Sequence, residues 1–256
     1  IVDGIPADVI ERVPTPAIDA IATAGGYSRA TVGGPIGASG ETPTISAPGY
    51  MSLITGTWAN KHNVYKNYGI SPDYRYWNVF RLVSAERPEL RLAIFSTWTD
   101  NRTILLGEGL AEAGNWRFDV VVDGLEDDEV RFPPQPVDAH IADVDDAVSR
   151  EAARLIESEG PDLSWVYLQY TDDVAHKHGD SPALDQAVVD MDARLSLVWS
   201  AVKARQKAFG EDWLIIVTTD HGRDAKTGHD HGGQTERERT IWIATNSQRL
   251  PSDFYV

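Results

Sequence analysis

The sequence predicts an α/β fold with a mostly parallel central sheet and helices on both faces. Short apolar runs alternate with amphipathic stretches, as in strands joined by crossover helices. Residues 163–170 (LSWVYLQY) and 213–219 (WLIIVTT) are almost continuously apolar or β-branched, which is typical of strands buried on both faces. No internal repeat divides the chain, so we expect a single domain over residues 1–256.

The individual elements follow from periodicity and end signals. The predicted strands are residues 1–2, 27–32, 90–96, 118–122, 163–170, 213–219 and 240–245. The predicted helices are residues 15–24, 48–55, 102–113, 138–159 and 182–209, with Gly210 as the C-cap of the last. Residues 57–89 have many aromatics and no clean period, and we predict that they form an excursion over the candidate site.

The two ends of the chain carry an expectation of their own. The chain begins at Ile1 without an initiator methionine, and it stops soon after the predicted strand 240–245. We therefore expect it to be truncated at both ends.

Composition excludes several classes of function. The formal net charge is -16, which disfavours a protein that coats nucleic-acid duplexes. The chain has no cysteine, so disulfides and thiolate zinc sites are excluded, and a metal must bind Asp, Glu, His or hydroxyl groups. No apolar run is long enough to span a bilayer. The lack of cysteine is compatible with an exported protein, and we expect a periplasmic or extracellular location.

Acidic residues follow three of the predicted strands. Asp3 comes after the first, Asp172 after strand 163–170, and Asp220 after strand 213–219. Ligands of open parallel sheets bind beyond the carboxyl ends of the strands, so the three carboxylates are expected at one edge.

The histidines cluster in the same loops. Five of the seven are His176, His178, His221, His229 and His231. Asp172 and His176 are four residues apart, so one helical turn would direct both at one ion. Alone, Asp172 would be interpreted as a helix N-cap and each histidine as a surface residue. Together they predict a metal site, with zinc or manganese suited to carboxylate and imidazole ligands.

Ser46 is the candidate nucleophile. It lies in a loop that leads into a helix, and Pro48 suits the first helical turn. Near a helix N-terminus, backbone N–H groups and the helix dipole favour a phosphate. An ordinary capping serine is the alternative, but a neighbouring metal ion can activate a serine hydroxyl.

Four motifs in this order resemble the alkaline phosphatase superfamily, and most closely its nucleotide pyrophosphatase/phosphodiesterase (type I phosphodiesterase) branch. They are Val2-Asp3-Gly4, the segment from Pro43 through Ser46 to Gly56, Asp172-x-x-x-His176-x-x-Gly179, and Thr219-Asp220-His221-Gly222 followed by His231-Gly232-Gly233. The resemblance covers most of the chain and implies the three-layer sandwich of that superfamily.

The resemblance also implies a function and a set of site residues. It implies two divalent metal ions, most readily zinc with manganese as the alternative, and hydrolysis of a small phosphate ester, including nucleotides, through a phosphoseryl intermediate on Ser46. One metal site would consist of Asp172, His176 and His231. The other would consist of Asp3, Asp220, His221 and the Ser46 oxygen. Asn67 would support a phosphoryl oxygen.

Three departures from the family pattern concern the substrate. The phosphodiesterase branch usually has threonine as the nucleophile, where this chain has Ser46. The segment between the Asp220-His221 pair and His231 is short, so part of the usual nucleotide-recognition surface is missing. The chain also ends early relative to the family core.

Other functions remain open at this point. A sulfatase would need Arg where Tyr50 follows Ser46-Ala47-Pro48-Gly49, and a phosphoglycerate mutase of this type is usually much longer. A phosphomonoesterase, a phosphonate hydrolase or a non-catalytic metal- or phosphate-binding protein are the alternatives. Aromatic residues in 57–77 also allow a carbohydrate-binding surface. The sequence leaves the oligomeric state open.

Overall fold

The computed structural model describes residues 1–133, 135, 137–252 and 254 of the chain. Its helices are α1 (Ala7–Ile10), α2 (Pro16–Ala24), α3 (Ser46–Thr55), α4 (Ala59–His62), α5 (Val79–Glu86), α6 (Val137–Glu159), α7 (Tyr170–His178), α8 (Pro182–Phe209) and α9 (Glu236–Arg239), with a π-helical turn η1 (Asn101–Leu105). Its strands are β1 (Gly26–Thr31), β2 (Leu92–Ser96), β3 (Val120–Val122), β4 (Leu163–Tyr167), β5 (Ile216–Thr218) and β6 (Thr240–Thr245).

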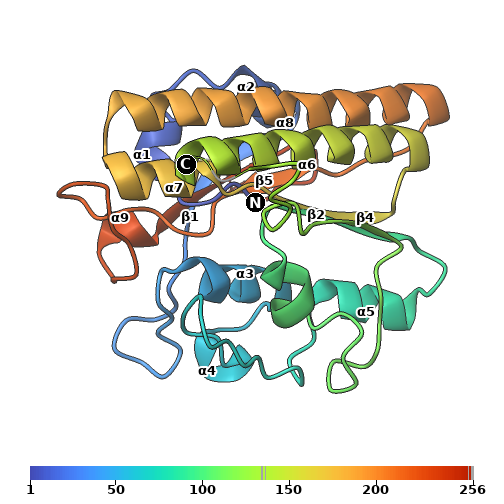
Figure 1. Cartoon of the computed structure of the whole chain (residues 1–256), viewed down its shortest axis with the longest axis horizontal. Coiled ribbons are helices and arrows are strands. Elements are labelled where there is room, and N and C mark those ends of the chain that lie inside the picture. The colour runs from blue at the N-terminus through green and yellow to red at the C-terminus, as the bar shows by residue number, and fades with distance from the viewer. Residues whose placement is uncertain (134, 136, 253, 255–256) are drawn as a thin grey trace.

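The strands lie between two layers of helices (Figure 1). Helices α2, α6, α7 and α8 cover one side, and α3, α4 and α5 lie on the other. Strand β2 shows why both sides are covered, because its side chains alternate between faces. Ala93 and Phe95 pack in the hydrophobic cluster with α6 and α8, whereas Leu92 and Ile94 pack in a second cluster with α3 and α5.

The strands form two small sheets, and only one of them is parallel. The order β3-β2-β4 is parallel, whereas β1-β6-β5 is antiparallel. The expectation of a mostly parallel central sheet is therefore met only in part. Continuous apolar runs indicate burial on both faces, and they do not distinguish the direction of a neighbouring strand.

The first residues of the chain lie between the two sheets. Val2 forms a parallel bridge with Leu168 at the end of β4, and its N–H donates to the Thr218 carbonyl of β5 at 3.0 Å. The Asp3 N–H donates to the Leu168 carbonyl at 3.0 Å. This position places Asp3 beside the ends of β4 and β5.

The two long amphipathic helices agree closely with the prediction. Helix α6 and helix α8 have the expected bounds to within one residue, and α8 ends at Gly210 with a left-handed φ of 69°. Ser181 caps its other end by accepting a hydrogen bond from the Leu184 N–H. Among the described residues, none of the helices has the length and apolar composition needed to cross a membrane.

Several predicted elements differ in the structure. The helix expected over 102–113 is only the turn η1, because Gly107 and Gly109 adopt positive φ values of 65° and 74° that a right-handed helix excludes. The strand expected over 163–170 ends at Tyr167, and Tyr170 already begins α7. The segment 57–89 contains helices α4 and α5, which the sequence pattern did not reveal.

Candidate metal centre and nucleophile

Ser46 occupies the first helical position of α3. Ile45 before it is extended, with φ -123° and ψ 153°, and Pro48 falls in the first turn, where its missing N–H costs nothing. The helix approaches Asp220 closely at Gly49, since a Cβ there would lie 3.1 Å from the Asp220 Cβ. Ser46 is therefore held against the end of β5 and is buried there.

A first group of side chains converges on the Nε2 atom of His221. Asp3 Oδ1 and Asp220 Oδ2 each lie 3.4 Å from it, and Ser46 Oγ lies 3.5 Å from it. All four residues are buried. They come from the start of the chain, from α3 and from the segment after β5, so only the tertiary structure brings them together.

A second group lies beside the first. Asp172 and His176 are on one face of α7, with Asp172 Oδ2 and His176 Nε2 3.3 Å apart. His231 places its Nε2 3.0 Å from His176 Nε2.

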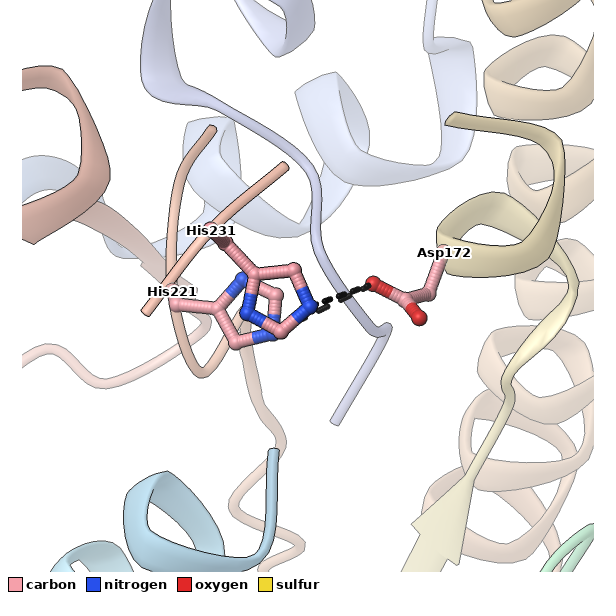
Figure 2. A group of neighbouring side chains, drawn as sticks. All are labelled: Asp172, His221 and His231. Atoms are coloured by element: carbon pink, nitrogen blue, oxygen red, sulfur yellow. Dashed lines mark ion pairs between the residues drawn. The ribbon is translucent and has the colours of Figure 1, made fainter. Parts of the chain in front are cut away.

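The two groups are contiguous. Figure 2 shows Asp172 pointing from α7 toward the stacked rings of His221 and His231. Asp172 Oδ1 lies 3.9 Å from His221 Nε2 and 3.8 Å from His231 Nε2. Geometry therefore places His221 within reach of both groups, and the closer distances pair it with Asp3 and Asp220.

Backbone carbonyls determine which nitrogen of two histidines carries the proton. His221 Nδ1 lies 2.9 Å from the Gly222 carbonyl, and His231 Nδ1 lies 2.8 Å from the Thr44 carbonyl. A carbonyl only accepts, so each Nδ1 must donate, and the neutral rings direct the lone pair of Nε2 into the site. Burial lowers the pKa of both rings, which keeps them neutral near pH 7.

The carboxylates of Asp3 and Asp220 each leave one oxygen without a donor. Gly4 N–H donates to Asp220 Oδ1, but Asp220 Oδ2 and Asp3 Oδ1 are buried and accept no hydrogen bond from the described residues. Burial, and after it the charge of neighbouring aspartates, raises the pKa of Asp3 well above its usual range. Burial raises the pKa of Asp220 to about 7.

Asp172 differs because it has a cationic neighbour. Burial alone would raise its pKa, but the Arg223 guanidinium and a hydrogen bond from His176 hold the pKa of this carboxyl well below its usual range. Arg223 has no exposed surface and donates to both the side chain and the backbone carbonyl of Asp172.

The donor set fits divalent cations. Carboxylate oxygens and imidazole nitrogens converge, and ionisation of these carboxylates in a buried site requires a counter-charge. Ligands about 2.0 Å from a tetrahedral zinc ion are about 3.3 Å apart. The distances of 3.3 and 3.0 Å around His176 and of 3.4 Å around His221 match this separation between ligands. By the convergence of their ligand atoms, two clusters of the described residues could hold a metal ion, Asp172 with His221 and His231, and Asp3 with Asp220 and His221; the two share His221, and His176 lies beside the first.

Asn67 lies beside the nucleophile rather than among the acidic groups. Its Oδ1 accepts a hydrogen bond of 2.9 Å from the Ala47 N–H, next to Ser46. The structure thus brings together the eight residues singled out from the sequence: Asp3, Ser46, Asn67, Asp172, His176, Asp220, His221 and His231. Their roles as ligands or catalytic groups stay predictions.

Three further residues of the site were missed from the sequence. Arg223 follows Gly222 directly, and a cation within a segment of acids and histidines was its only signal. Tyr50 lies one helical turn after Ser46, and Tyr167 is the last residue of β4. Both tyrosine hydroxyls donate to Asp3 Oδ2. His229, expected in the metal loop, contacts the His176 carbonyl through Nδ1 instead.

Comparisons with known proteins agree with this architecture. The chain matches no curated protein at a significant level. The phosphonoacetate hydrolase of Sinorhizobium meliloti 1021 has a TM-score of 0.56 at 21% identity, over 88% of this chain and 56% of that one. Murine ectonucleotide pyrophosphatase / phosphodiesterase 5, solved as an inactive form in complex with AMP, has a TM-score of 0.58 at 20% identity, over 88% and 57%.

A third solved structure extends the likeness. The phosphonate monoester hydrolase of Agrobacterium radiobacter has a TM-score of 0.62 at 14% identity, over 96% of this chain and 67% of that one. At these identities the structural likeness concerns the fold, and this chain spans little more than half the length of the first two proteins. The sequence profile for type I phosphodiesterase / nucleotide pyrophosphatase matches residues 1–237. This chain therefore belongs to the type I phosphodiesterase / nucleotide pyrophosphatase family of the alkaline phosphatase superfamily.

Proposed function

We propose that this chain hydrolyses phosphate esters with two divalent metal ions, and that Ser46 is the nucleophile. The observation that carries the proposal is the position of Ser46 Oγ, 3.5 Å from His221 Nε2, at the start of a helix that faces the convergent carboxylates. Asp172, His176 and His231 would hold one ion, and Asp3, Asp220, His221 and Ser46 Oγ the other. Zinc suits this set of nitrogen and oxygen ligands.

The chain's own residues would bind and orient the substrate. When bound, the metal ions supply Lewis acidity that activates the nucleophile and stabilises the charge of the leaving oxygen. In the first turn of α3 the Ala47 N–H is bound to Asn67 and Pro48 has no N–H, so the helix would offer the Ser46 N–H and the positive end of its dipole to a phosphoryl group. Asn67 would donate from its amide to a phosphoryl oxygen, because its Oδ1 is already held by Ala47.

The proposed reaction has two steps. Ser46 Oγ loses its proton and forms a bond to phosphorus while the bond from phosphorus to the leaving oxygen breaks, and the leaving alcohol, or phosphate in the case of a pyrophosphate, takes up a proton. The resulting phosphoseryl group keeps the remaining ester of a diester substrate. Water then cleaves the bond from Ser46 Oγ to phosphorus and restores the serine hydroxyl, so one water is consumed for each bond broken in the substrate. We propose a phosphodiester or a nucleotide pyrophosphate as substrate, as the family description suggests and as the AMP complex of the murine relative supports.

The test compares substrate classes and two serines of the same helix. We expect the purified protein to contain two divalent ions and to cleave bis-p-nitrophenyl phosphate faster than p-nitrophenyl phosphate or phosphonoacetate. Ser46→Ala should lower turnover at least ~10³-fold, as loss of a catalytic nucleophile does elsewhere, while metal content is retained. Ser52→Ala is the control within α3, because the Ser52 hydroxyl contacts the Pro48 carbonyl and His62 Nε2 and none of the candidate metal ligands.

Each other result of this test has a distinct meaning. Ser46→Ala with normal turnover would exclude the nucleophile. A preference for p-nitrophenyl phosphate would indicate a phosphomonoesterase, and a preference for phosphonoacetate a phosphonate hydrolase. Bound metal without turnover on any of these substrates would favour a non-catalytic binding protein.

A further inference from the structure

The two oxygens of Asp3 have opposite surroundings. Tyr167 OH donates to Oδ2 at 2.7 Å, and Tyr50 OH donates to the same oxygen. Oδ1 is buried, accepts no hydrogen bond from the described residues, and lies 3.4 Å from His221 Nε2. Oδ2 is thus held by two hydroxyl donors, whereas Oδ1 faces His221 Nε2.

The two tyrosines are rigid parts of the core. Tyr50 is fully buried and Tyr167 is 2% exposed. Their rings meet edge to face with centroids 5.1 Å apart, and their hydroxyl oxygens are 2.9 Å apart. They come from two different elements, because Tyr50 belongs to α3 and Tyr167 to β4. Movement of either hydroxyl would require displacement of a packed ring.

Hydrogen bonds to an ionised carboxylate are about twice as strong as neutral ones. Two such bonds on Oδ2 oppose rotation of the Asp3 carboxylate and leave Oδ1 as the oxygen that faces His221. Tyr50 lies four residues after Ser46 on α3, so the same bond also ties the helix that carries the nucleophile to Asp3.

We propose that Tyr50 and Tyr167 are positioning residues that restrict Asp3 to one-oxygen coordination of a divalent cation and hold Ser46 in register with that cation. This inference rests on the proposed function. It assigns no contact between either tyrosine and the substrate, and it predicts an effect confined to one of the two metal ions.

The experiment measures metal binding directly. Zinc is titrated into the cation-free protein in competition with a chelator of known affinity, for wild type, Tyr50→Phe and Tyr167→Phe. Each substitution removes one hydroxyl and keeps the ring. We expect the affinity for one zinc ion to fall about 10- to 100-fold, as for other partners of metal ligands, and the other affinity to stay within about twofold. At saturating zinc, kcat should fall while KM changes little.

A matched control and a second background separate positioning from folding. Tyr27 OH donates to Glu11 Oε1 at 3.0 Å, so Tyr27→Phe removes another tyrosine–carboxylate bond away from the metal ligands. It should leave both zinc affinities unchanged. In an Asp3→Ala background, Tyr50→Phe and Tyr167→Phe should have no further effect on the remaining ion.

Three results would overturn the inference. The first is that both tyrosine variants bind zinc with wild-type affinity and differ from wild type only in their melting temperature in chelator. That is the behaviour of purely structural residues. The second is an equal loss of affinity for both zinc ions, which would indicate a general loss of packing. A wild-type protein that binds no divalent cation would refute both this inference and the proposed function. If wild type binds two zinc ions and is active, but the tyrosine variants behave like it, only this inference is refuted. If Tyr50→Phe does not fold, Tyr167→Phe decides the question.

Discussion

The Arg223 guanidinium pairs with the Asp172 carboxylate in the interior of the protein. It also donates to the Gly4 carbonyl at 3.2 Å and to the His229 carbonyl at 3.1 Å. These contacts join the start of the chain, α7 and the loop before α9, which are three of the segments that carry the candidate ligands. The Arg223 charge helps to hold the pKa of Asp172 below its usual range, whereas the pKa values of Asp3 and Asp220 are raised.

Replacement of Arg223 should destabilise the cation-free protein most. Loss of one partner of a buried pair leaves an uncompensated charge and typically costs about 3–5 kcal/mol. We expect Arg223→Met to lower the free energy of unfolding by that amount in chelator, and by less in excess zinc, because the cation then compensates Asp172. Arg223→Lys keeps the charge, so its free energy of unfolding should lie between those of wild type and Arg223→Met. Denaturant unfolding under both conditions measures the difference.

Arg29 provides the control for that prediction. It pairs with Glu11 at the surface, and its side chain is 51% exposed. Arg29→Met should cost less than about 1 kcal/mol in either condition. An Arg223→Met variant as stable as Arg29→Met would contradict a structural role for the buried pair.

Asn67 should influence turnover without influencing metal content. Loss of one donor to a phosphoryl oxygen typically costs about 10²- to 10³-fold in kcat. We expect a loss of that order in Asn67→Ala, with zinc affinity unchanged. Asn67→Asp keeps an acceptor for the Ala47 N–H but lacks the amide donor, so it should be equally slow. If Asn67→Asp is as fast as wild type, Asn67 acts only as the acceptor for the Ala47 N–H and not as a donor to the substrate.

Removal of divalent cations should lower the stability of the native state. A ligand that binds only the folded chain stabilises it by about 2.7 kcal/mol when its concentration is 100 times its dissociation constant. We expect the melting temperature to rise with zinc concentration in wild type and to rise less in His231→Ala, which retains the Asp3, Asp220 and His221 group. A melting temperature indifferent to chelator and to zinc would argue against both sites.

Protonation of His62 should destabilise the fold in mild acid. His62 has no exposed surface, its Nδ1 accepts from the Val64 N–H at 3.2 Å, and its Nε2 lies 3.1 Å from Ser52 Oγ. The Val64 N–H can only donate, so Nδ1 must be unprotonated and Nε2 must carry the hydrogen. Burial lowers the pKa of His62 from 6.5 to about 4.

The sign of the pH effect follows from the two pKa values. Between pH 6.5 and 4 the unfolded chain binds a proton at this residue and the folded chain does not, so stability is fully present above pH 6.5 and falls as pH drops toward 4. The stability advantage of wild type over His62→Gln should therefore shrink over this range, by up to about 2–3 kcal/mol. Chemical denaturation at pH 7, 5.5 and 4 measures it. A constant difference would show that His62 is not the group responsible.

Local sequence signals were sufficient where the structure depends on neighbours in the chain. Helix α8 could be predicted from the apolar spacing of its residues and from Gly210, because capping and helical periodicity are local. Asp172 and His176 could be paired because one helical turn brings them to one face of α7. The helix expected over 102–113 failed for an equally local reason, since Gly107 and Gly109 interrupt it.

The sequence by itself determined the family, the α/β character and the identity of the side chains able to bind metal ions, because these depend on motifs and on side-chain chemistry. Only the tertiary structure decided that β5, β6 and β1 are antiparallel, that Arg223 neutralises Asp172, and that Tyr50 and Tyr167 hold one oxygen of Asp3. Asp3 and Tyr167 are 164 residues apart. They meet because the first residues of the chain pair with the end of β4, and no short-range pattern encodes such a pairing.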